Sequence, residues 1–336
     1  MARTRVVLIA GTGLVLATVL YLPHLTTASW LYWESLTALW STETPTMGTR
    51  VLPWLLHLTW PGPAETQVAQ FVLHVVVAGL IAGLLRGLGA SPAWATTGGV
   101  LLLVNPVAVE AVRHGTGGAD LLVAVGTVGA CLAALHRWWL AMGLGLVVAL
   151  LSKETGIVSL ALVPLVLWIG RVRVSQTWVV WYAVSVWLVG LGVLTWAHAE
   201  QGVYNLINRD QFAVEMSGVS WGLLQGTATL RLLTTALTGL GMTTDFDYDR
   251  VRVTMQVVSV LALGGLAGLA WSVRASAPLV AMGLAWVLVA SALRWVVQTP
   301  AAYYSEHQFY VGLVGLVCAV VGMLTVSSKG AAQWQR

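Results

Sequence analysis

The stretch NPVAVEAVRHGTGGADLL, residues 105–122, places side chains capable of acid–base and ion-pair chemistry between two long apolar runs. Its six polar or charged residues are Asn105, Glu110, Arg113, His114, Thr116 and Asp120. Such groups are costly inside a membrane, so they mark either a hairpin between two helices or the rim of a functional site. Glu110 and Arg113 are three residues apart on one helical face, where they also have the simpler role of neutralising each other.

A second charged motif, LSKETG, follows the next apolar runs and contains Lys153 beside Glu154. Lys153 is one of only two lysines in the chain. At the depth of the lipid headgroups, its fixed positive charge would bind a phosphate. The alternative is that the Lys–Glu pair simply lets a helix end at the membrane surface.

The acidic run DFDYDR is a candidate for binding a metal ion. Divalent cations such as Ca²⁺ and Mg²⁺ prefer carboxylate oxygens, and in an extended chain the three carboxylates of Asp245, Asp247 and Asp249 would lie on one side. The commoner meaning of such a run is a solvated turn. No HExxH or GxSxG motif is present, and the glycine-rich stretches do not follow a strand as a nucleotide-binding loop requires.

Composition indicates whether the chain folds in water or in a membrane. Of its 336 residues 58% are hydrophobic and only 9% charged, with a mean hydropathy of +0.81. A soluble domain carries about 25% charged residues, so this composition predicts an integral membrane protein. The isoelectric point near 9.3 would suggest nucleic acid as the partner of a soluble protein, but here we attribute it to membrane topology and expect no nucleic acid.

Apolar runs long enough to span a bilayer, roughly 17–25 residues, predict an all-α polytopic fold with about ten transmembrane helices. They lie near residues 5–22, 67–86, 92–112, 118–135, 138–152, 156–170, 176–197, 253–272, 276–297 and 308–326. The whole chain, 1–336, is then one transmembrane domain without a soluble domain. Its outer loops are about 23–66, 113–117, 198–252 and 298–308.

Charge is distributed unequally over the two predicted faces. With the amino terminus in the cytoplasm, nine of the seventeen basic residues and none of the thirteen acids fall at inner ends and loops. This is the positive-inside pattern, and it predicts a plasma (inner) membrane protein with both termini cytoplasmic. The Arg-rich, Ala-, Gly- and Val-rich composition is typical of a bacterial genome of high GC content.

Two outer loops contain stretches with helical spacing of apolar and aromatic residues. SWLYWESLTALW lies in the first loop, and VSWGLLQGTATLRLLTTAL, about 219–237, lies in the long loop. We expect both to form amphipathic helices in the plane of the membrane interface, where tryptophan is favoured. Their role is either simple anchoring or a platform over a cavity open to lipid.

The order of these motifs resembles one family. VNPVAVEAVRHGTGGADLL is similar to the HPxxxEAV…GRADLL signature of transmembrane O-mannosyltransferases that carry tetratricopeptide repeats, and ALLSKETGIVSLALVPLV is similar to their LLSKExxxxLPLLL block. TRVLPWLLHL with FVLHVVVAGLIAGLLRGLG, and SEHQFYVGLVG, resemble further family segments. The matches run in a consistent order from about residue 30 to 320.

That family belongs to the GT-C superfamily of polytopic glycosyltransferases, which transfer a sugar from a polyprenyl-phosphate carrier on the outer or lumenal face. The resemblance implies a catalytic carboxylate in the first outer loop, for which Glu34 is the candidate. It implies basic residues near the carrier phosphate, and the candidates are Lys153, Arg50 and Arg113. Candidates for binding sugar hydroxyls or orienting the cations are Glu110, Asp120, Glu154 and Glu306.

The chain departs from the family pattern at several positions. Trp33–Glu34 stands where an Asp–Asp pair is expected, Asn105 where His is usual, Gly118 where Arg is usual, and His307 where Arg is usual. Tetratricopeptide repeats do not follow the last apolar run. Two alternatives therefore stay open: either Glu34 alone is the catalytic carboxylate, or the chain has lost catalysis.

Three hypotheses follow. The first is an inverting glycosyltransferase that uses a polyprenyl-phosphate sugar and a protein or glycan acceptor, with a divalent cation as an optional cofactor. The second is a GT-C-like scaffold that has lost catalysis and serves as a subunit of a membrane complex. The third is a transporter or flippase, which would require charges near the membrane midplane.

Overall fold

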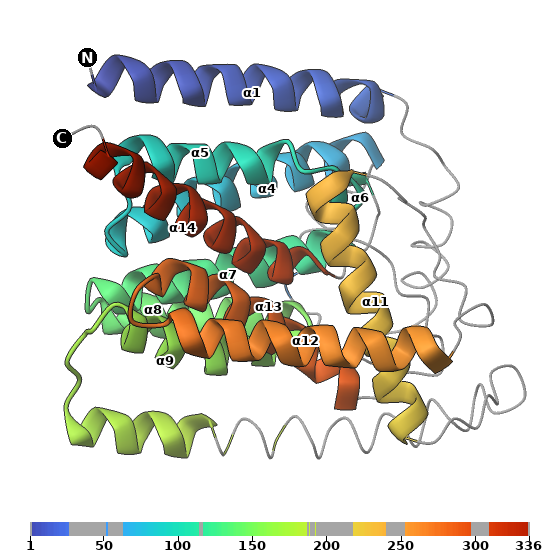
Figure 1. The fold of residues 1–336 in the computed structure, drawn as a ribbon. Helices are drawn as coiled ribbons and strands as arrows, with labels where there is room; N and C mark the ends of the chain where they lie inside the picture. The colour runs from blue at the N-terminus through green and yellow to red at the C-terminus, as the bar shows by residue number, and fades with distance from the viewer. Residues whose placement is uncertain are drawn as a thin grey trace, which may run out of the picture.

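In the computed structural model, the described residues are 2–26, 63–113, 117–186, 218–239, 253–296 and 309–334, with the single positions 52, 188 and 192. Regular structure over these residues is entirely helical, as the sequence predicts. Figure 1 shows that most helices lie side by side, with their axes running between the same two ends of the molecule.

The helices have the following bounds: α1 Ala2–Thr26, α4 Pro63–Gly87, α5 Pro92–Leu103, α6 Pro106–Arg113, α7 Gly117–Leu135, α8 Trp139–Ser152, η1 Glu154–Val158, α9 Ser159–Ile169, α11 Gly218–Thr238, α12 Val253–Val273, α13 Pro278–Val296 and α14 Tyr310–Trp334. Residues 176–186 are also helical. Every predicted apolar run within the described part of the chain therefore contains a helix.

Over the described residues, four helices are long and apolar enough to cross a membrane: Glu65–Gly87, Gly117–Leu135, Val253–Val273 and Tyr310–Ser327. The pair α5 and α6 makes a fifth if it is counted as one bent span. Shorter apolar helices, such as Trp139–Ser152 and Pro278–Ala292, lie beside them. This architecture is consistent with a helical membrane protein, while the total of about ten spans stays a prediction.

The run 92–112, expected as one helix, is broken between α5 and α6 with a bend of 54°. Pro106 has no N–H to continue the helix and disfavours helical backbone at the preceding residue, Asn105. Asn105 caps the new helix, since its Oδ1 accepts a hydrogen bond of 3.0 Å from the Val107 N–H. Its Nδ2 donates to the Ala236 carbonyl at 3.0 Å and so joins the break to α11.

The two ends of the bundle differ in composition. Helices α4, α7, α9 and α12 end on the side where α1 begins and α14 ends (Figure 1). Exposed basic residues lie in the last turn of these helices or directly after it: Arg86, Arg137, Arg171, Arg173 and Arg274. Exposed tryptophans accompany them: Trp138, Trp139, Trp168 and Trp271. We call this side the arginine end; arginine and tryptophan together are typical of a membrane interface.

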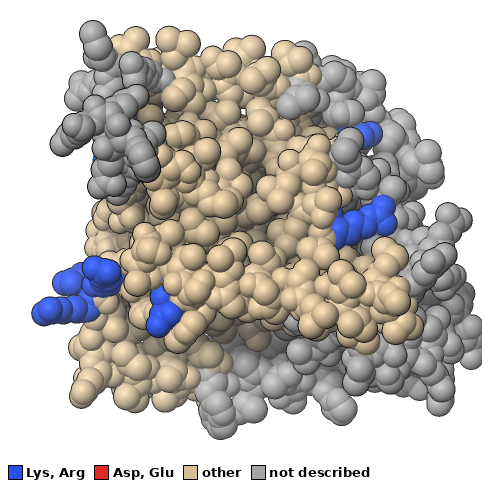
Figure 2. All heavy atoms as spheres, in the orientation of Figure 1, with Lys and Arg blue, Asp and Glu red and all other residues tan. Residues whose placement is uncertain are grey.

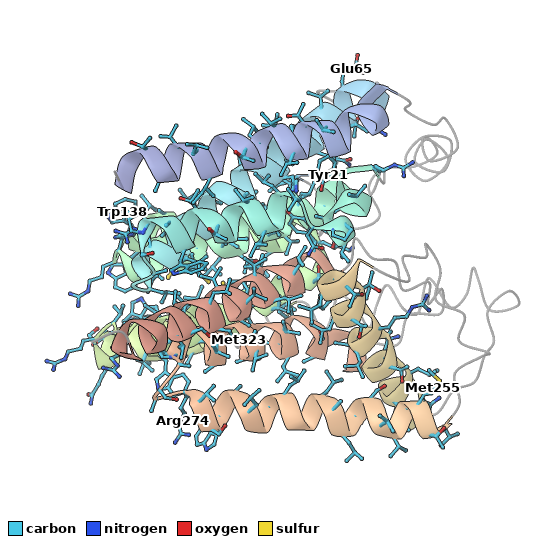
Figure 3. The ribbon with its side chains drawn as sticks, turned by 45° about the horizontal axis from the view of Figure 1, so that its top comes forward. Tyr21, Glu65, Trp138, Met255, Arg274 and Met323 are labelled. Atoms are coloured by element: carbon cyan, nitrogen blue, oxygen red, sulfur yellow. The ribbon has the colours of Figure 1, made fainter. Side chains whose placement is uncertain are left out.

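The four acids in the described part of the chain lie toward the opposite, acid-bearing end, at the start of α4, on α6, at the start of α7 and just after α8. In Figure 3, Glu65 and Met255 lie at this end, and Trp138 and Arg274 lie at the other. On the face shown in Figure 2, the described basic side chains lie toward the two ends, and the surface between them is uncharged. This separation agrees with the predicted charge asymmetry, although which end faces the cytoplasm stays a prediction.

Helix α11 runs steeply across the acid-bearing ends of the other helices (Figure 1), as expected of a helix in the plane of the membrane surface. It is packed into the bundle, because residues 224–229 are all buried. The stretch predicted as amphipathic in the long loop is therefore a helix. The similar stretch in the first loop, residues 29–40, lies outside the described residues.

Small residues bring α7 and α8 into close contact. A Cβ added to Gly126 would lie 2.5 Å from the Ala149 nitrogen and 2.6 Å from the Gly145 oxygen. A Cβ on Gly145 would lie 2.8 Å from both the Gly126 oxygen and the Ala130 nitrogen. Close backbone approach through Gly and Ala is the usual way in which helices pack in membranes. This contact sets the spacing of the two helices that carry Asp120 and Lys153.

Substituting Gly126 with Val should destabilise the protein by at least about 1–3 kcal/mol, because backbone atoms of α8 would have to move. Gly129→Val, on the same helix, is the matched control, since nothing lies within 4 Å of its added Cβ. Thermal unfolding of both variants in detergent measures the difference. Equal loss of stability in the two variants would contradict close α7–α8 packing.

Candidate functional site

The predicted site residues divide into three groups. Those outside the described residues are Glu34, Arg50, Glu306, Asp245, Asp247 and Asp249. Glu110 and Glu154 are described by their backbone only, on α6 and at the start of η1. Arg113, Asp120 and Lys153 are described in full. The structure therefore tests one part of the predicted site, where the blocks EAV…AD and SKE meet.

Lys153 sits at a break in the chain, in extended conformation with φ −167° and ψ 153°. The break separates α8 from η1, and Gly156 makes it compact, because a Cβ at Gly156 would overlap the Ala149 carbonyl. The Gly156 N–H donates to the Lys153 carbonyl at 2.8 Å, and Ser159 Oγ donates to the Gly156 carbonyl at 2.6 Å. The motif SKETG thus leaves the helix at its lysine and re-enters a helix directly after it.

Asp120 lies in the first turn of α7, about 5 Å from the start of that helix at 1.5 Å per residue. The two glycines before it allow close packing. A Cβ on Gly117 would overlap the Ala111 carbonyl of α6, and one on Gly118 would lie 3.1 Å from Gln70 Nε2 of α4. The position where the family pattern expects Arg is therefore packed against Gln70, and a long side chain would have to displace it.

Asp120 and Lys153 form a buried ion pair. Lys153 Nζ lies 3.0 Å from Asp120 Oδ1 and 2.9 Å from Oδ2, and the two side chains are 9% and 2% exposed. The helix ends support both charges: the first turn of a helix favours an anion, and the last turn favours a cation. Asp120 lies in the first turn of α7, and Lys153 follows the last turn of α8. The two motifs singled out from the sequence meet at this pair.

The pair changes the expected role of Lys153. The lysine was predicted as a free charge for a phosphate, or as the partner of Glu154. In the structure Asp120, 33 residues away, is a partner that neutralises it. The predicted pairing of Glu110 with Arg113 is not tested, but the two residues do share α6, and the Arg113 side chain is exposed.

A second polar group, which sequence reasoning did not assign to a site, lies deeper in the bundle. His74 of α4 is fully buried, with Nδ1 2.5 Å from Tyr310 Oη of α14. Its Nε2 lies 3.2 Å from Tyr21 Oη of α1 and 3.3 Å from the Leu103 carbonyl at the end of α5. A carbonyl can only accept, so Nε2 carries a proton, and in a neutral ring Nδ1 accepts from Tyr310.

The only signal for this network in the sequence was polar residues within apolar runs, because the partners are 53 and 236 residues apart. Figure 3 shows Tyr21 on the side of α1 toward the acid-bearing end. The network joins four helices, α1, α4, α5 and α14, and lies near the middle of α4. Of these four helices, α4 packs directly against α7, which carries Asp120.

No group of three His, Cys, Asp or Glu side chains within the described ranges is arranged to hold a metal ion. The acidic run at 245, 247 and 249 lies outside these ranges, so the cation site there stays a prediction. No family model, curated protein or solved structure matches this chain. The site is therefore interpreted from its own geometry and from the motif resemblance.

Removing one member of the buried pair should be far more costly than removing both. Asp120→Asn removes the carboxylate that neutralises the buried Lys153, and Lys153→Met removes the cation bound by the buried Asp120; either change alone should cost about 3–5 kcal/mol. The double variant Lys153→Met/Asp120→Asn has neither charge and should recover most of the loss. Thermal or denaturant unfolding of all four proteins in detergent gives the coupling energy. Additive losses would show that the two side chains do not interact.

The network at His74 makes a separate prediction. Tyr310→Phe removes the donor to His74 Nδ1 and leaves a buried acceptor without its partner, at a cost of about 1–3 kcal/mol. Tyr182→Phe is a suitable comparison, because its hydroxyl also donates to a carbonyl, that of Leu160 at 2.8 Å, but from a position that is only half-buried. A smaller loss for Tyr310→Phe than for Tyr182→Phe would contradict a tightly held histidine.

Proposed function

We propose that the protein transfers a sugar from a polyprenyl-phosphate carrier at its acid-bearing end, which we place at the outer face of a bacterial inner membrane. The Lys153–Asp120 pair carries this proposal. It joins the two motif blocks that resemble the O-mannosyltransferase family, and both blocks lie at one end of the bundle. The exposed Arg113 adds a cation at the same end.

The proposed reaction is a direct displacement at the anomeric carbon. Glu34 accepts the proton of the acceptor hydroxyl as its oxygen bonds to the anomeric carbon, with inversion. The bond from that carbon to the phosphate oxygen breaks, and polyprenyl phosphate leaves with the electron pair. The phosphate gains one negative charge in this step, so a nearby cation stabilises the transition state more than the ground state.

Lys153 can supply that cation only by exchanging Asp120 for the phosphate. In this proposal, the exposed Arg113 and the predicted Arg50 bind the phosphate first. The approaching negative charge then competes with Asp120 for the lysine. Asp120 holds Lys153 in place between turnovers, and Glu110, Glu154 and Glu306 bind sugar hydroxyls or orient the cations.

Glu34→Gln should abolish transfer while leaving the protein folded, because Gln cannot accept the proton. Release of polyprenyl phosphate from labelled polyprenyl-phosphate mannose, in proteoliposomes with an acceptor extract, measures the reaction. Glu65→Gln is the matched control, since Glu65 is an exposed carboxylate at the same end and has no assigned role. Full activity of Glu34→Gln would remove Glu34 from the mechanism.

The double variant Lys153→Met/Asp120→Asn tests the phosphate role separately from folding. If it folds as expected, turnover should fall about 10²–10³-fold, the usual cost of losing one group that stabilises developing charge. Unchanged turnover would limit the pair to a structural role.

One observation favours a second candidate function, a scaffold subunit that has lost catalysis. The charge of Lys153 is compensated by Asp120 in a buried pair, as in a purely structural contact. A monodisperse chain that transfers sugar by itself would contradict the scaffold. Partners that remain stoichiometric through purification, without turnover of the carrier lipid, would support it. A transporter is less well supported, since the described acids lie toward one end of the bundle.

A further inference from the structure

At the arginine end, opposite the candidate site, the structure has a pocket of about 430 Å³ between the end of α9, the end of α12 and the start of α13. Its wall contains two cationic side chains, Arg171 and Arg274, and apolar side chains that include Leu167, Trp168, Val172 and Pro278. The volume lies within the range of small-molecule sites, about 300–1,000 Å³.

Hydrogen bonds hold the backbone of the turn at Arg171 and the side chain of Arg274. The turn after α9 is closed by hydrogen bonds from the Arg171 N–H to the Trp168 carbonyl, 3.1 Å, and from the Val172 N–H to the Leu167 carbonyl, 3.0 Å. Arg274 Nη1 donates to the Trp271 carbonyl at 2.5 Å. Its Cζ lies 3.8 Å from the centre of the Trp271 ring, a cation–π contact. The positive charge of Arg274 is therefore oriented before any ligand binds, while Arg171 is placed at the pocket by the backbone of its turn.

Nothing in the described part of the chain neutralises these two charges, because its acids belong to the other end of the bundle. The start of α13 adds the positive end of a helix dipole at Pro278. A pocket of this electrostatic character favours an anion, and arginine is well suited to phosphate because its guanidinium donates two parallel hydrogen bonds.

The surroundings favour a phosphate that belongs to a lipid. The pocket is beside the exposed tryptophans that mark the interface, and its remaining walls are apolar. Helix α12, which ends at it, has only 17% of its apolar stretch buried, with Leu269 and Trp271 exposed near the pocket. An acyl chain can lie along this face while the headgroup reaches the arginines. Basic pockets between transmembrane helices bind anionic headgroups in this way.

We propose that the pocket at Arg171 and Arg274 binds the phosphate group of an anionic phospholipid, with its acyl chain along α12. This site is separate from the proposed sugar-transfer site and does not depend on its activity. It would hold α9, α12 and α13 together at the membrane surface. A free phosphate ester shares the charge chemistry but would leave the apolar walls without a partner.

The experiment uses the full chain in non-ionic detergent and counts bound lipids by native mass spectrometry. Dioleoylphosphatidylglycerol is compared with dioleoylphosphatidylcholine, which has the same chains and no net charge. We expect the glycerol lipid to bind at least tenfold more tightly. In Arg171→Gln/Arg274→Gln its affinity should fall about 30-fold, with phosphatidylcholine unchanged, since each arginine near an anionic headgroup contributes about a fivefold effect.

Three controls make the result decisive. Arg137→Gln changes the charge of an exposed arginine at the same end that does not line the pocket, and it should bind the lipid as the unaltered chain does. Arg171→Lys/Arg274→Lys keeps the charge and should retain most of the affinity, even if the Gln variant proves unstable. Millimolar inorganic phosphate should not displace the lipid; displacement would keep the phosphate site but extend it to soluble esters. Equal losses for Arg137→Gln and the double Gln variant, or no preference for the anionic lipid, would overturn the proposal.

Discussion

The attraction between the Lys153 ammonium and the Asp120 carboxylate determines how α7, α8 and η1 meet, because a charge with so little access to water is not stable alone. The lysine reaches Asp120 from a point where the helix is interrupted, and the carboxylate lies at the favourable end of another helix. The break after α8, the close approach at Gly156 and the two glycines before Asp120 allow these two charges to meet. Any anion that uses Lys153 must compensate for the loss of this contact.

Close packing through small residues makes the pair geometrically possible. Gly126 and Gly145 let α7 and α8 approach at backbone distance, and Gly283 and Gly315 do the same for α13 and α14. The α13–α14 contact is fixed by Trp286 Nε1, which donates to the Val311 carbonyl at 2.8 Å. That hydrogen bond lies one residue from Tyr310 and so helps to position its hydroxyl against His74. Close helix packing thus accompanies a polar contact both at α7 and α8 and at α13 and α14.

The sequence predicted the helical class, the positions of the apolar helices and the gathering of the acids on one side, because these depend on composition and local periodicity. The bend at Asn105 had a local signal in Pro106, but the apolar character of residues on both sides outweighed it and led to the prediction of one span. The pairing of Lys153 with Asp120 had no local signal at all. The same is true of His74, whose partners are brought to it by the packing of α1, α5 and α14.

The two ends of the bundle hold their charges in physically different ways. At the acid-bearing end, Lys153 already has a counter-ion inside the protein. An anionic ligand can therefore bind the lysine only by replacing the Asp120 carboxylate, which lies at hydrogen-bond distance. At the arginine end, Arg171 and Arg274 have no acid nearby among the described residues, so an anion gains the full interaction on arrival. The first arrangement suits a charge that is needed transiently, as when a leaving group develops charge during a reaction. The second suits a ligand that stays bound, and a membrane rich in anionic lipid provides one at high local concentration.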